Sequence, residues 1–348
     1  YPLRRQRQMC IRDRVDTYLK DARPLNIPGW LPESPSEVLP LGQGEYNMNF
    51  HIQQGGVCWV LRINTGSQIG LSDREQIAYE YNTLALLEPA EIAPKPYFLD
   101  NSFRYLPYGI LGMAFLSGEK LDYTRDLEDA ARLFARYHQL EIPDVANHLI
   151  KEEQPLSLTY QRCLRMLKVY LESDLADPDL CSYLSEVRDW ANTARHRETY
   201  YQNDPWYCII NTEVNNGNWI VNRQDGTFHL VDWEKPLWGD PSQDLSHFRV
   251  PTTTLWKTDY RMTEADKARM MSAYKNAIRD PHLRDTIEER TRLRDPFNCL
   301  RGVSWCAMAW VQYRRGDHLL KNVDTFRKLS MYVDLNFVRS LFDPYMRL

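Results

Sequence analysis

Three polar residues within the stretch 211–232 have the types and the order that phosphoryl transfer requires. Glu213 lies at an expected loop position, Asn218 follows it, and Asp232 ends an apolar run that is typical of a β-strand. The polar, glycine-containing segment 222–226 separates that run from another short apolar run, which predicts a hairpin. We expect the hairpin to bring one carboxylate, one amide and a second carboxylate to the same end of a small sheet.

Such a set supplies the parts of a kinase-type site. One acidic group accepts or orients the proton of the acceptor hydroxyl, and two oxygen ligands hold Mg²⁺ against the phosphates of ATP. The plainer interpretation is a polar turn capped by Asn218 and an aspartate that ends a strand. It leaves unexplained the joint spacing with Glu213 and with the Gly-Asp-Pro-x-x-Asp sequence at 239–244. We therefore favour the phosphoryl-transfer interpretation.

The order of these segments resembles the aminoglycoside phosphotransferase/choline kinase family of kinase-like enzymes. That family carries His-Gly-Asp-Leu-His-Pro-Gly-Asn, then a hairpin, then Asp-Trp/Phe-Glu and Gly-Asp-Pro-x-x-Asp-Leu. The corresponding segments are Asn-Thr-Glu-Val-Asn-Asn-Gly-Asn at 211–218, Asp-Trp-Glu at 232–234 and Gly-Asp-Pro-Ser-Gln-Asp-Leu at 239–245. The spacing matches throughout, and Glu213 stands at the position of the catalytic aspartate.

The resemblance implies ATP and Mg²⁺ as cofactors and a small molecule as the phosphoryl acceptor. Glu213, Asn218 and Asp232 are then the catalytic residues, and Asn218 and Asp232 are also the metal ligands. It further implies a nucleotide-binding set: a glycine loop over the phosphates, a strand cation with its helix partner, and an interlobe hinge. The members of that set are Gly42, Gly44, Asn47, Arg62, Glu80, Ala114 and Leu116.

Arg62 is the one charge inside an apolar, strand-like run. It is either an outward-facing arginine on a half-buried strand or the phosphate-binding cation of a kinase-like lobe, and arginine can hold phosphate and carboxylate bidentately. Its partner would lie on the predicted helix 73–87, where the pattern alone allows both Glu75 and Glu80. The resemblance selects Glu80.

The predicted fold is α+β and protein-kinase-like, with a β-rich N-lobe, a mostly helical C-lobe and the nucleotide between them. We assign residues 15–117 to the nucleotide-binding N-lobe, built on a five-stranded sheet, and residues 118–348 to the catalytic, acceptor-binding C-lobe. His138 lies on an apolar helix face and is expected to pack in the core. The apolar periodicity predicts C-lobe helices over 127–140, 156–172, 180–194, 264–278, 300–313 and 324–341.

Residues 1–14 are strongly basic and begin without methionine. They can be interpreted as a nucleic-acid or membrane-binding arm, as a targeting peptide, or as translated adapter sequence at the edge of an assembled fragment. The segment has no apolar core of the kind that a targeting peptide needs. We favour a non-native or disordered segment and exclude it from the functional argument.

Composition narrows the possible functions further. The 348 residues carry a net charge of −4, so the chain has no general electrostatic preference for nucleic acid or anionic membranes. No apolar run approaches the length of a membrane helix, which is about 20 residues. The seven cysteines are dispersed without a C-x-x-C pair, which favours free thiols in a reducing cytoplasm. We expect a cytoplasmic protein, with a monomer as the default.

The acceptor is the part of the function that the sequence defines least. Aromatic residues are frequent in the predicted C-lobe and suit an ammonium group through cation–π contact, as in an amino sugar or amino alcohol, although most of them could be core residues. The segment 252–257 is expected to be a loop near the acceptor, and Asp240 and Asp244 are expected to brace the catalytic loop. Because Asn211 and Glu213 depart from the family pattern, the alternative is a nucleotide-binding, non-catalytic member of the same fold.

Overall fold

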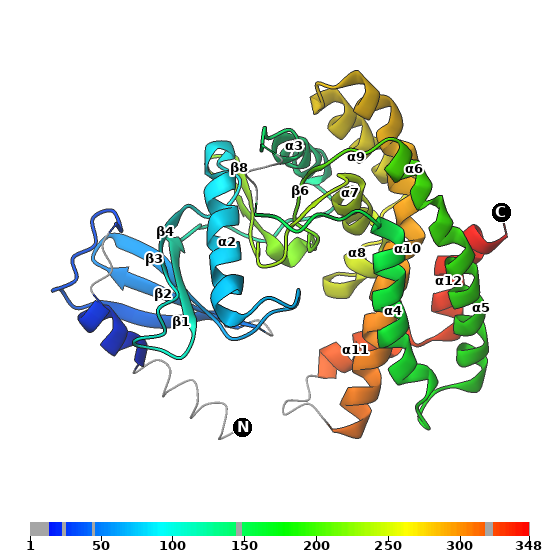
Figure 1. Cartoon of the computed structure of the whole chain (residues 1–348), viewed down its shortest axis with the longest axis horizontal. Helices are drawn as coiled ribbons and strands as arrows, with labels where there is room; N and C mark the ends of the chain where they lie inside the picture. The colour runs from blue at the N-terminus through cyan, green and yellow to red at the C-terminus, as the bar shows by residue number, and fades with distance from the viewer. Residues whose placement is uncertain (1–13, 23–25, 44–45, 144–147, 317–322, 348) are drawn as a thin grey trace. The chain divides into compact units, whose positions relative to one another are not determined.

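The computed structural model describes residues 14–22, 26–43, 46–143, 148–316 and 323–347 (Figure 1). Gly44 and nearly all of the segment 1–14 therefore lie outside the described residues. The chain forms two compact units, each built from several stretches of sequence. The first unit comprises residues 1–121, 140–150 and 218–236, and the second comprises 122–139, 151–217 and 237–348. The single boundary expected after residue 117 stays a prediction.

The first unit contains the antiparallel five-stranded sheet that the sequence predicted. Its strands lie in the order β1-β2-β3-β5-β4. The central strand β3 is buried at most positions because both of its neighbours and the helix above the sheet cover it. The strands are β1 (Glu37–Gln43), β2 (Asn47–Gln54), β3 (Val57–Asn64), β4 (Pro96–Asp100) and β5 (Gly109–Ala114).

Helix α2 (Asp73–Leu87) packs against this sheet and has the bounds that its periodicity predicted. Ser72 begins the helix, since its side chain accepts from the Glu75 N–H while the Glu75 carboxylate accepts from Ser72 in a capping box. The helix approaches β5 so closely that a Cβ atom on Gly109 would lie 2.4 Å from Ile77 Cγ2. Glu75 is thus used at the helix N-terminus, which leaves it no part in a pair with Arg62.

The predicted hairpin also belongs to the first unit. It consists of β7 (Trp219–Asn222) and β8 (Thr227–Leu230), which pair antiparallel around a turn with Gly226 at a positive φ of 69°. The Leu230 N–H donates to the Ile92 carbonyl oxygen at 2.8 Å, and Val221 forms a bridge with Glu119. These bonds attach the hairpin to the segments that surround it.

The second unit is helical apart from the short pair of strands β6 (Cys208–Ile210) and β9 (Leu237–Gly239). Its core lies between α4, α5, α10 and the C-terminal helices, and α4 runs beside α10 (Figure 1). The helices are α3 (Leu127–His138), α4 (Pro155–Leu171), α5 (Pro178–Ala194), α6 (Thr199–Asn203), α7 (Ser242–Arg249), α8 (Pro251–Lys257), α9 (Glu264–Ala277), α10 (Pro281–Arg315), α11 (Val323–Tyr332) and α12 (Leu335–Met346).

Three sequence expectations for this unit were wrong. The segment 252–257 is helical and forms most of α8, where Pro251 occupies the first helical turn. The single helix expected over 324–341 is interrupted, because Asp334 caps the start of α12 and accepts from the Phe337 N–H at 2.9 Å. Helix α10 begins well before the predicted residue 300, since its first half buries arginines in ion pairs and so lacks an apolar stripe.

Two properties of the described residues concern membrane crossing and cysteine chemistry. None of their helices combines the length and the apolar character that crossing a bilayer requires. The six cysteines among them are free thiols, as the dispersed spacing predicted.

Candidate functional site

The Asp-Trp-Glu segment follows the hairpin and is fixed by the tryptophan in its middle. Trp233 is fully buried, and its indole N–H donates to the Leu230 carbonyl oxygen at 2.8 Å. Asp232 adopts a left-handed backbone conformation with φ at 65°, which aspartate tolerates better than most residues. The Val231 N–H donates to the Asn218 carbonyl oxygen at 2.8 Å. The hairpin therefore holds Asn218 beside the segment that carries Asp232.

Arg62 is the centre of a buried ion cluster in the first unit. Its Nε lies 3.1 Å from Glu80 Oε2, while its Nη2 lies 2.6 Å from Asp232 Oδ1 and 3.4 Å from Glu234 Oε2. The predicted Arg62–Glu80 pair is present, and both side chains are almost completely buried. One guanidinium thus joins β3, α2 and the Asp-Trp-Glu segment.

Glu234 carries the other hydrogen bonds of this cluster. Asn47 Nδ2 makes a short hydrogen bond to Glu234 Oε2, and Gln68 Nε2 donates to Oε1 at 2.5 Å. Gln76 on α2 donates to the Glu234 carbonyl oxygen at 2.5 Å. Asn47 also accepts from Asn64 at 3.1 Å, so both the nitrogen and the oxygen of its amide bond to groups inside the protein. Asn47 thus positions Glu234, and its predicted contact with nucleotide stays a prediction.

Burial and mutual repulsion set the protonation of these carboxylates. Burial raises the pKa of Glu80 to about 8; the Arg62 charge opposes this shift, and those of Asp232 and Glu234 add to it. The pKa of Glu234 is raised as well, first by burial and then by Asp232. Burial lowers the pKa of Arg62, but the charges of Glu80, Asp232 and Glu234 outweigh it and hold that pKa above its ordinary value. The cluster contains more carboxylate than cation.

This excess of carboxylate fits a divalent cation beside Asp232. The Asp232 side chain is 34% exposed, whereas that of Glu80 is almost completely buried. Carboxylate and amide oxygens are suitable ligands for Mg²⁺, which keeps several waters and binds few protein groups. No set of three or more His, Cys, Asp and Glu residues that could cage a metal occurs in the described part of the chain. Asn218 and Asp232 are therefore compatible with Mg²⁺ held jointly with phosphate oxygens.

The remaining predicted nucleotide contacts lie at the edges of the sheet. Gly42 pairs with Asn49 at a bulge near the end of β1, and a Cβ atom there would meet nothing within 4 Å. The protein itself does not require glycine at this position, so an approaching ligand would be a reason for it. The Ala114 N–H already donates to the Lys95 carbonyl oxygen at 2.8 Å, and Leu116 follows the end of β5 half-buried. Their hinge role stays a prediction.

In the second unit, Asp244 holds the loop that carries Glu213. Its two carboxylate oxygens accept from the Asn211 N–H at 2.7 Å and from the Thr212 N–H at 2.8 Å, and Tyr137 donates to it at 2.5 Å. Asp244 is fully buried. Burial raises its pKa, but hydrogen bonds from His138 and Tyr137 outweigh burial and keep that pKa below its ordinary value. The predicted bracing role of Asp244 is confirmed.

The Glu213 carboxylate faces an arginine that sequence reasoning did not identify. Arg301 Nη2 contacts Glu213 Oε1, and Arg301 Nη1 donates to the Thr212 carbonyl oxygen at 3.0 Å. Both side chains are about one quarter exposed. The Glu213 N–H donates to Asn211 Oδ1 at 2.9 Å, so the loop is fixed from both sides. Glu213 is a positioned, partly accessible carboxylate beside a cation.

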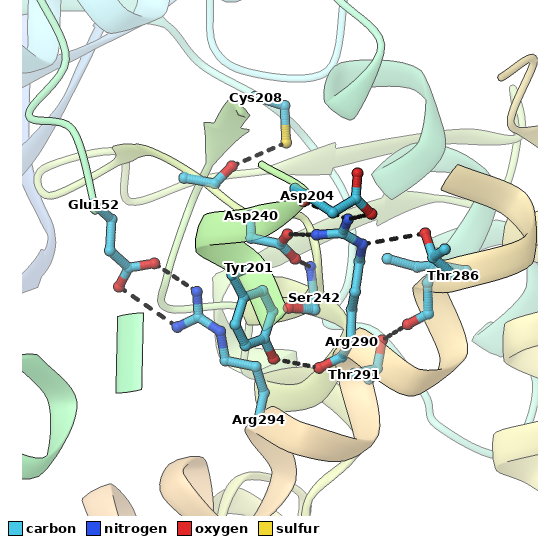
Figure 2. Close-up of polar contacts among 12 residues, drawn as sticks. Glu152, Tyr201, Asp204, Cys208, Asp240, Ser242, Thr286, Arg290, Thr291 and Arg294 are labelled. Atoms are coloured by element: carbon cyan, nitrogen blue, oxygen red, sulfur yellow. Dashed lines mark hydrogen bonds and ion pairs between the residues drawn. The ribbon is translucent and has the colours of Figure 1, made fainter. Parts of the chain in front are cut away.

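Asp240 was expected to brace the same loop, and that expectation was wrong. Asp240 Oδ2 accepts from Arg290 at 2.6 Å, and Arg290 also contacts Asp204 (Figure 2). The neighbouring Arg294 donates to Glu152 at 2.6 Å, which makes a second buried ion pair from the next turn of α10. The aspartate of the Gly-Asp-Pro sequence therefore anchors α10, which in turn carries Arg301.

His138 has the packed core position predicted for it. Its Nδ1 lies 3.0 Å from the Tyr274 hydroxyl and its Nε2 lies 3.5 Å from Asp244. Burial lowers the pKa of His138. A buried, neutral histidine beside Asp244 supports the loop and does not face solvent.

Sequence reasoning missed three important residues, for different reasons. Glu234 lies within the recognised Asp-Trp-Glu sequence, and its place in that motif was a signal that could have been used. Gln76 lies on the buried face of α2, where an amide is itself unusual. Arg301 gave no local signal, because only the long-range packing of α10 brings it to Glu213.

Comparison with known proteins identifies the family of this chain. The profile of the phosphotransferase enzyme family matches residues 37–283, which is most of the chain and includes Arg62, Glu213 and Asp232. The chain belongs to this family. No curated protein sequence matches it.

Solved structures of phosphotransferases share the fold. A choline kinase from Cryptosporidium parvum Iowa II superposes with a TM-score of 0.65 at 14% identity, covering 95% of this chain and 97% of the other. An ethanolamine kinase from Plasmodium vivax superposes with a TM-score of 0.60 at 12% sequence identity, and the match covers 93% of this chain and 88% of the kinase. Spectinomycin phosphotransferase bound to ADP and spectinomycin superposes with a TM-score of 0.58 at 13% sequence identity, and the match covers 89% of this chain and 93% of the other. At such identities the likeness establishes the fold alone, and it confirms the predicted kinase-like α+β architecture.

Proposed function

We propose that this phosphotransferase transfers the γ-phosphoryl group of ATP to a hydroxyl of a small molecule. The observation that supports the proposal is that Asp244 fixes the backbone of the loop 211–213, and Glu213 in this loop stands at the sequence position of the family's catalytic aspartate. The acceptor oxygen would form the new bond to phosphorus as the bond to the leaving ADP oxygen breaks. The hydroxyl proton would pass to Glu213.

The first unit would bind the nucleotide. We assign Asn218 and Asp232 to Mg²⁺, which when bound neutralises and orients the phosphates. Arg62 keeps Asp232 in place from the protein side at 2.6 Å, and Glu80 keeps Arg62 in place. Glu213 has the charge of aspartate on a longer side chain, and Arg301 limits where that side chain can point. Positioning of this kind dominates a loose phosphoryl-transfer transition state.

The expected amino sugar or amino alcohol is one candidate acceptor class. The aromatic argument for it is weakened by the structure, because Trp233 and Trp238 are buried. Trp256 is half-buried, but the Lys257 ammonium already lies 5.2 Å from its ring centroid. The ring therefore has a cation from the protein itself.

A second candidate function is nucleotide binding without catalysis. The contact between Arg301 and Glu213 favours it, since a cation of the protein itself already engages the carboxylate that would act on the acceptor. The two candidates share the nucleotide and differ in whether a phosphoryl group leaves it.

The experiment that tests the proposal measures ADP release from Mg-ATP with a panel of small alcohols. The panel contains amino sugars, amino alcohols, neutral polyols and hydroxy acids. We expect acceptor-dependent ADP release above the rate with water. If ATP binds in calorimetry but no acceptor increases ADP release, the non-catalytic function is favoured.

A further inference from the structure

Thr212, the residue that precedes Glu213, has a backbone conformation that threonine rarely adopts. Its φ is 72°, in the left-handed region, where a branched Cβ atom crowds the backbone. A residue stays in this region only when its surroundings hold it there. Thr212 stands where the family sequence has glycine, which tolerates the same conformation without strain. In this chain, other side chains must therefore hold the turn before Glu213.

Two residues far along the chain bond to the peptide groups on both sides of Thr212. Asp244 Oδ1 accepts from the Thr212 N–H at 2.8 Å, and Arg301 Nη1 donates to the Thr212 carbonyl oxygen at 3.0 Å. Thr212 itself is buried. Because a buried peptide group that loses its partner destabilises the folded state, both bonds oppose relaxation of the turn. The left-handed conformation is thus fixed from both sides.

The arginine that bonds to the Thr212 carbonyl oxygen also contacts the carboxylate of the next residue. Arg301 Nη2 contacts Glu213 Oε1, so one guanidinium joins oxygens of two adjacent residues. The planar fork of a guanidinium binds two oxygens in a fixed relative geometry, which the ammonium group of a lysine does not impose. The direction of the Glu213 side chain is therefore tied to the strained turn.

Arg301 can act in this way because its helix is anchored along the same face. Positions 290, 294 and 301 are four and seven residues apart, which places their side chains on one face of α10. Arg290 and Arg294 are buried, and they pair with Asp240 and Glu152 at 2.6 Å each (Figure 2). These ion pairs restrain the rotation of α10 about its axis, and with it the position of Arg301.

We propose that Arg301 is a positioning residue: it holds Thr212 in its left-handed conformation and so directs the Glu213 carboxylate at the acceptor hydroxyl. This inference rests on the proposed phosphotransferase function, because the acceptor hydroxyl belongs to that reaction. It accounts for the departures from the family sequence at 212 and 213 together. A strained threonine and a carboxylate on a longer side chain both need a restraint, and Arg301 supplies it to both.

Hydrogen exchange measured by mass spectrometry tests the restraint without requiring catalysis. The amide protons of residues 211–213 are donated to side chains, two to Asp244 and one to Asn211, so their exchange reports opening of the turn. The wild-type protein is compared with Arg301→Met. Methionine keeps an unbranched side chain and a good helix propensity and removes the guanidinium.

Arg292→Met is the matched control, since it breaks an exposed pair with Glu289 on the same helix. Arg301→Met should accelerate the exchange of residues 211–213 at least about tenfold, the value of one charge-assisted hydrogen bond, and leave α4 and α5 unchanged. Arg292→Met should leave all three segments unchanged. Unchanged exchange of residues 211–213 in Arg301→Met would overturn the proposal. An equal rise throughout the second unit would also overturn it, because Arg301 would then support the whole unit.

Kinetics with an acceptor that the wild-type protein phosphorylates test the consequence for the reaction. Arg301→Met should lower kcat at least about tenfold without changing the Kd for ATP, because a displacement of the carboxylate by about 1 Å is enough for such a loss. Arg301→Lys keeps the charge without the fork, so its kcat should lie between those of Arg301→Met and the wild-type protein. An unchanged kcat in Arg301→Met would overturn the positioning role even if the turn exchanges faster.

Failure of the phosphotransferase function can be distinguished from failure of this inference. If the wild-type protein phosphorylates no acceptor but Arg301→Met accelerates exchange only at residues 211–213, the catalytic function fails and the restraint on the turn is supported. If the wild-type protein turns over and Arg301→Met changes neither the exchange nor kcat, the function stands and the role of Arg301 is overturned.

Discussion

Asp232 Oδ1 lies 2.6 Å from Arg62 Nη2, so the expected metal ligand is held by the strand cation. The same guanidinium contacts Glu80 and Glu234. Arg62 therefore offsets part of the negative charge of the cluster as well as positioning Asp232. This relationship makes stability and metal binding depend on the same side chain.

Replacement of Arg62 by alanine should destabilise the protein strongly. The change leaves Glu80 and Glu234 buried without their cation, and breaking a buried pair in this way costs about 3–5 kcal/mol. Urea unfolding measures the loss. The control is Lys95→Ala, which breaks a solvent-exposed pair with Glu88 and should therefore change the free energy of unfolding far less. Equal losses in the two variants would contradict the central role of Arg62.

The raised pKa of Glu80, about 8, predicts that its contribution to stability falls as pH rises. The unfolded chain loses this proton near the model-compound value of 4.5, so between these pH values the folded state binds more protons than the unfolded state. The free energy of unfolding then decreases with pH across that window. Glu80→Gln removes this dependence, and its stability relative to the parent should increase from about pH 5 to pH 8.

Glu75→Gln on the same helix is the matched control for that measurement. The side-chain and backbone hydrogen bonds with Ser72 lower the pKa of Glu75, so its stabilising contribution is fully present above the unfolded pKa and is lost only in acid. The change in the free energy of unfolding caused by Glu75→Gln should be constant over the pH window in which the change caused by Glu80→Gln varies. A constant difference between parent and Glu80→Gln would show that Glu80 is ionised throughout.

Substitution of Asp232 by asparagine should weaken the binding of ATP in the presence of Mg²⁺. Loss of a charged ligand is expected to cost at least about tenfold in that affinity, while affinity without Mg²⁺ changes little. Calorimetry with and without Mg²⁺ measures these two affinities for ATP separately. Asp225→Asn, an exposed change in the turn of the same hairpin, serves as the control. If the Mg²⁺-dependent part is untouched in Asp232→Asn, the ligand assignment is wrong.

Asp244→Asn tests the support of the loop that carries Glu213. One asparagine oxygen cannot replace two carboxylate oxygens that accept from Asn211 and Thr212, so the free energy of unfolding should fall by about 2–3 kcal/mol. Activity should fall with it, because the loop is displaced. Tyr137→Phe removes one bond to the same carboxylate and leaves the loop bonds intact. It should lose stability and keep most of the activity.

The elements that could be predicted from the sequence are those in which local pattern and packing agree. The strand-like runs predicted the sheet and the hairpin, and the segment 73–87 was predicted as a helix with the bounds that α2 has. The first half of α10 could not be found this way, since Arg290 and Arg294 are buried by partners far along the chain. The same long-range packing hid Arg301 and the true partner of Asp240. Charged residues buried in pairs look like surface residues in a sequence.

The central claim is that Glu213 orients the acceptor hydroxyl during phosphoryl transfer. Glu213→Gln keeps the size of the side chain and removes its charge, so it should lower kcat by at least about a hundredfold. The affinity for ATP should hardly change, because the lost contact is made mainly in the transition state. Glu213→Asp restores the residue usual in the family and reports whether the loop is adapted to the longer side chain.

The decisive measurement is therefore the kcat of Glu213→Gln on an acceptor that the wild-type protein phosphorylates, with the Kd for ATP determined on the same sample. A steep fall in kcat at unchanged Kd is the predicted result. A variant as active as its parent would show that Glu213 does not act on the acceptor hydroxyl and would contradict the proposed mechanism.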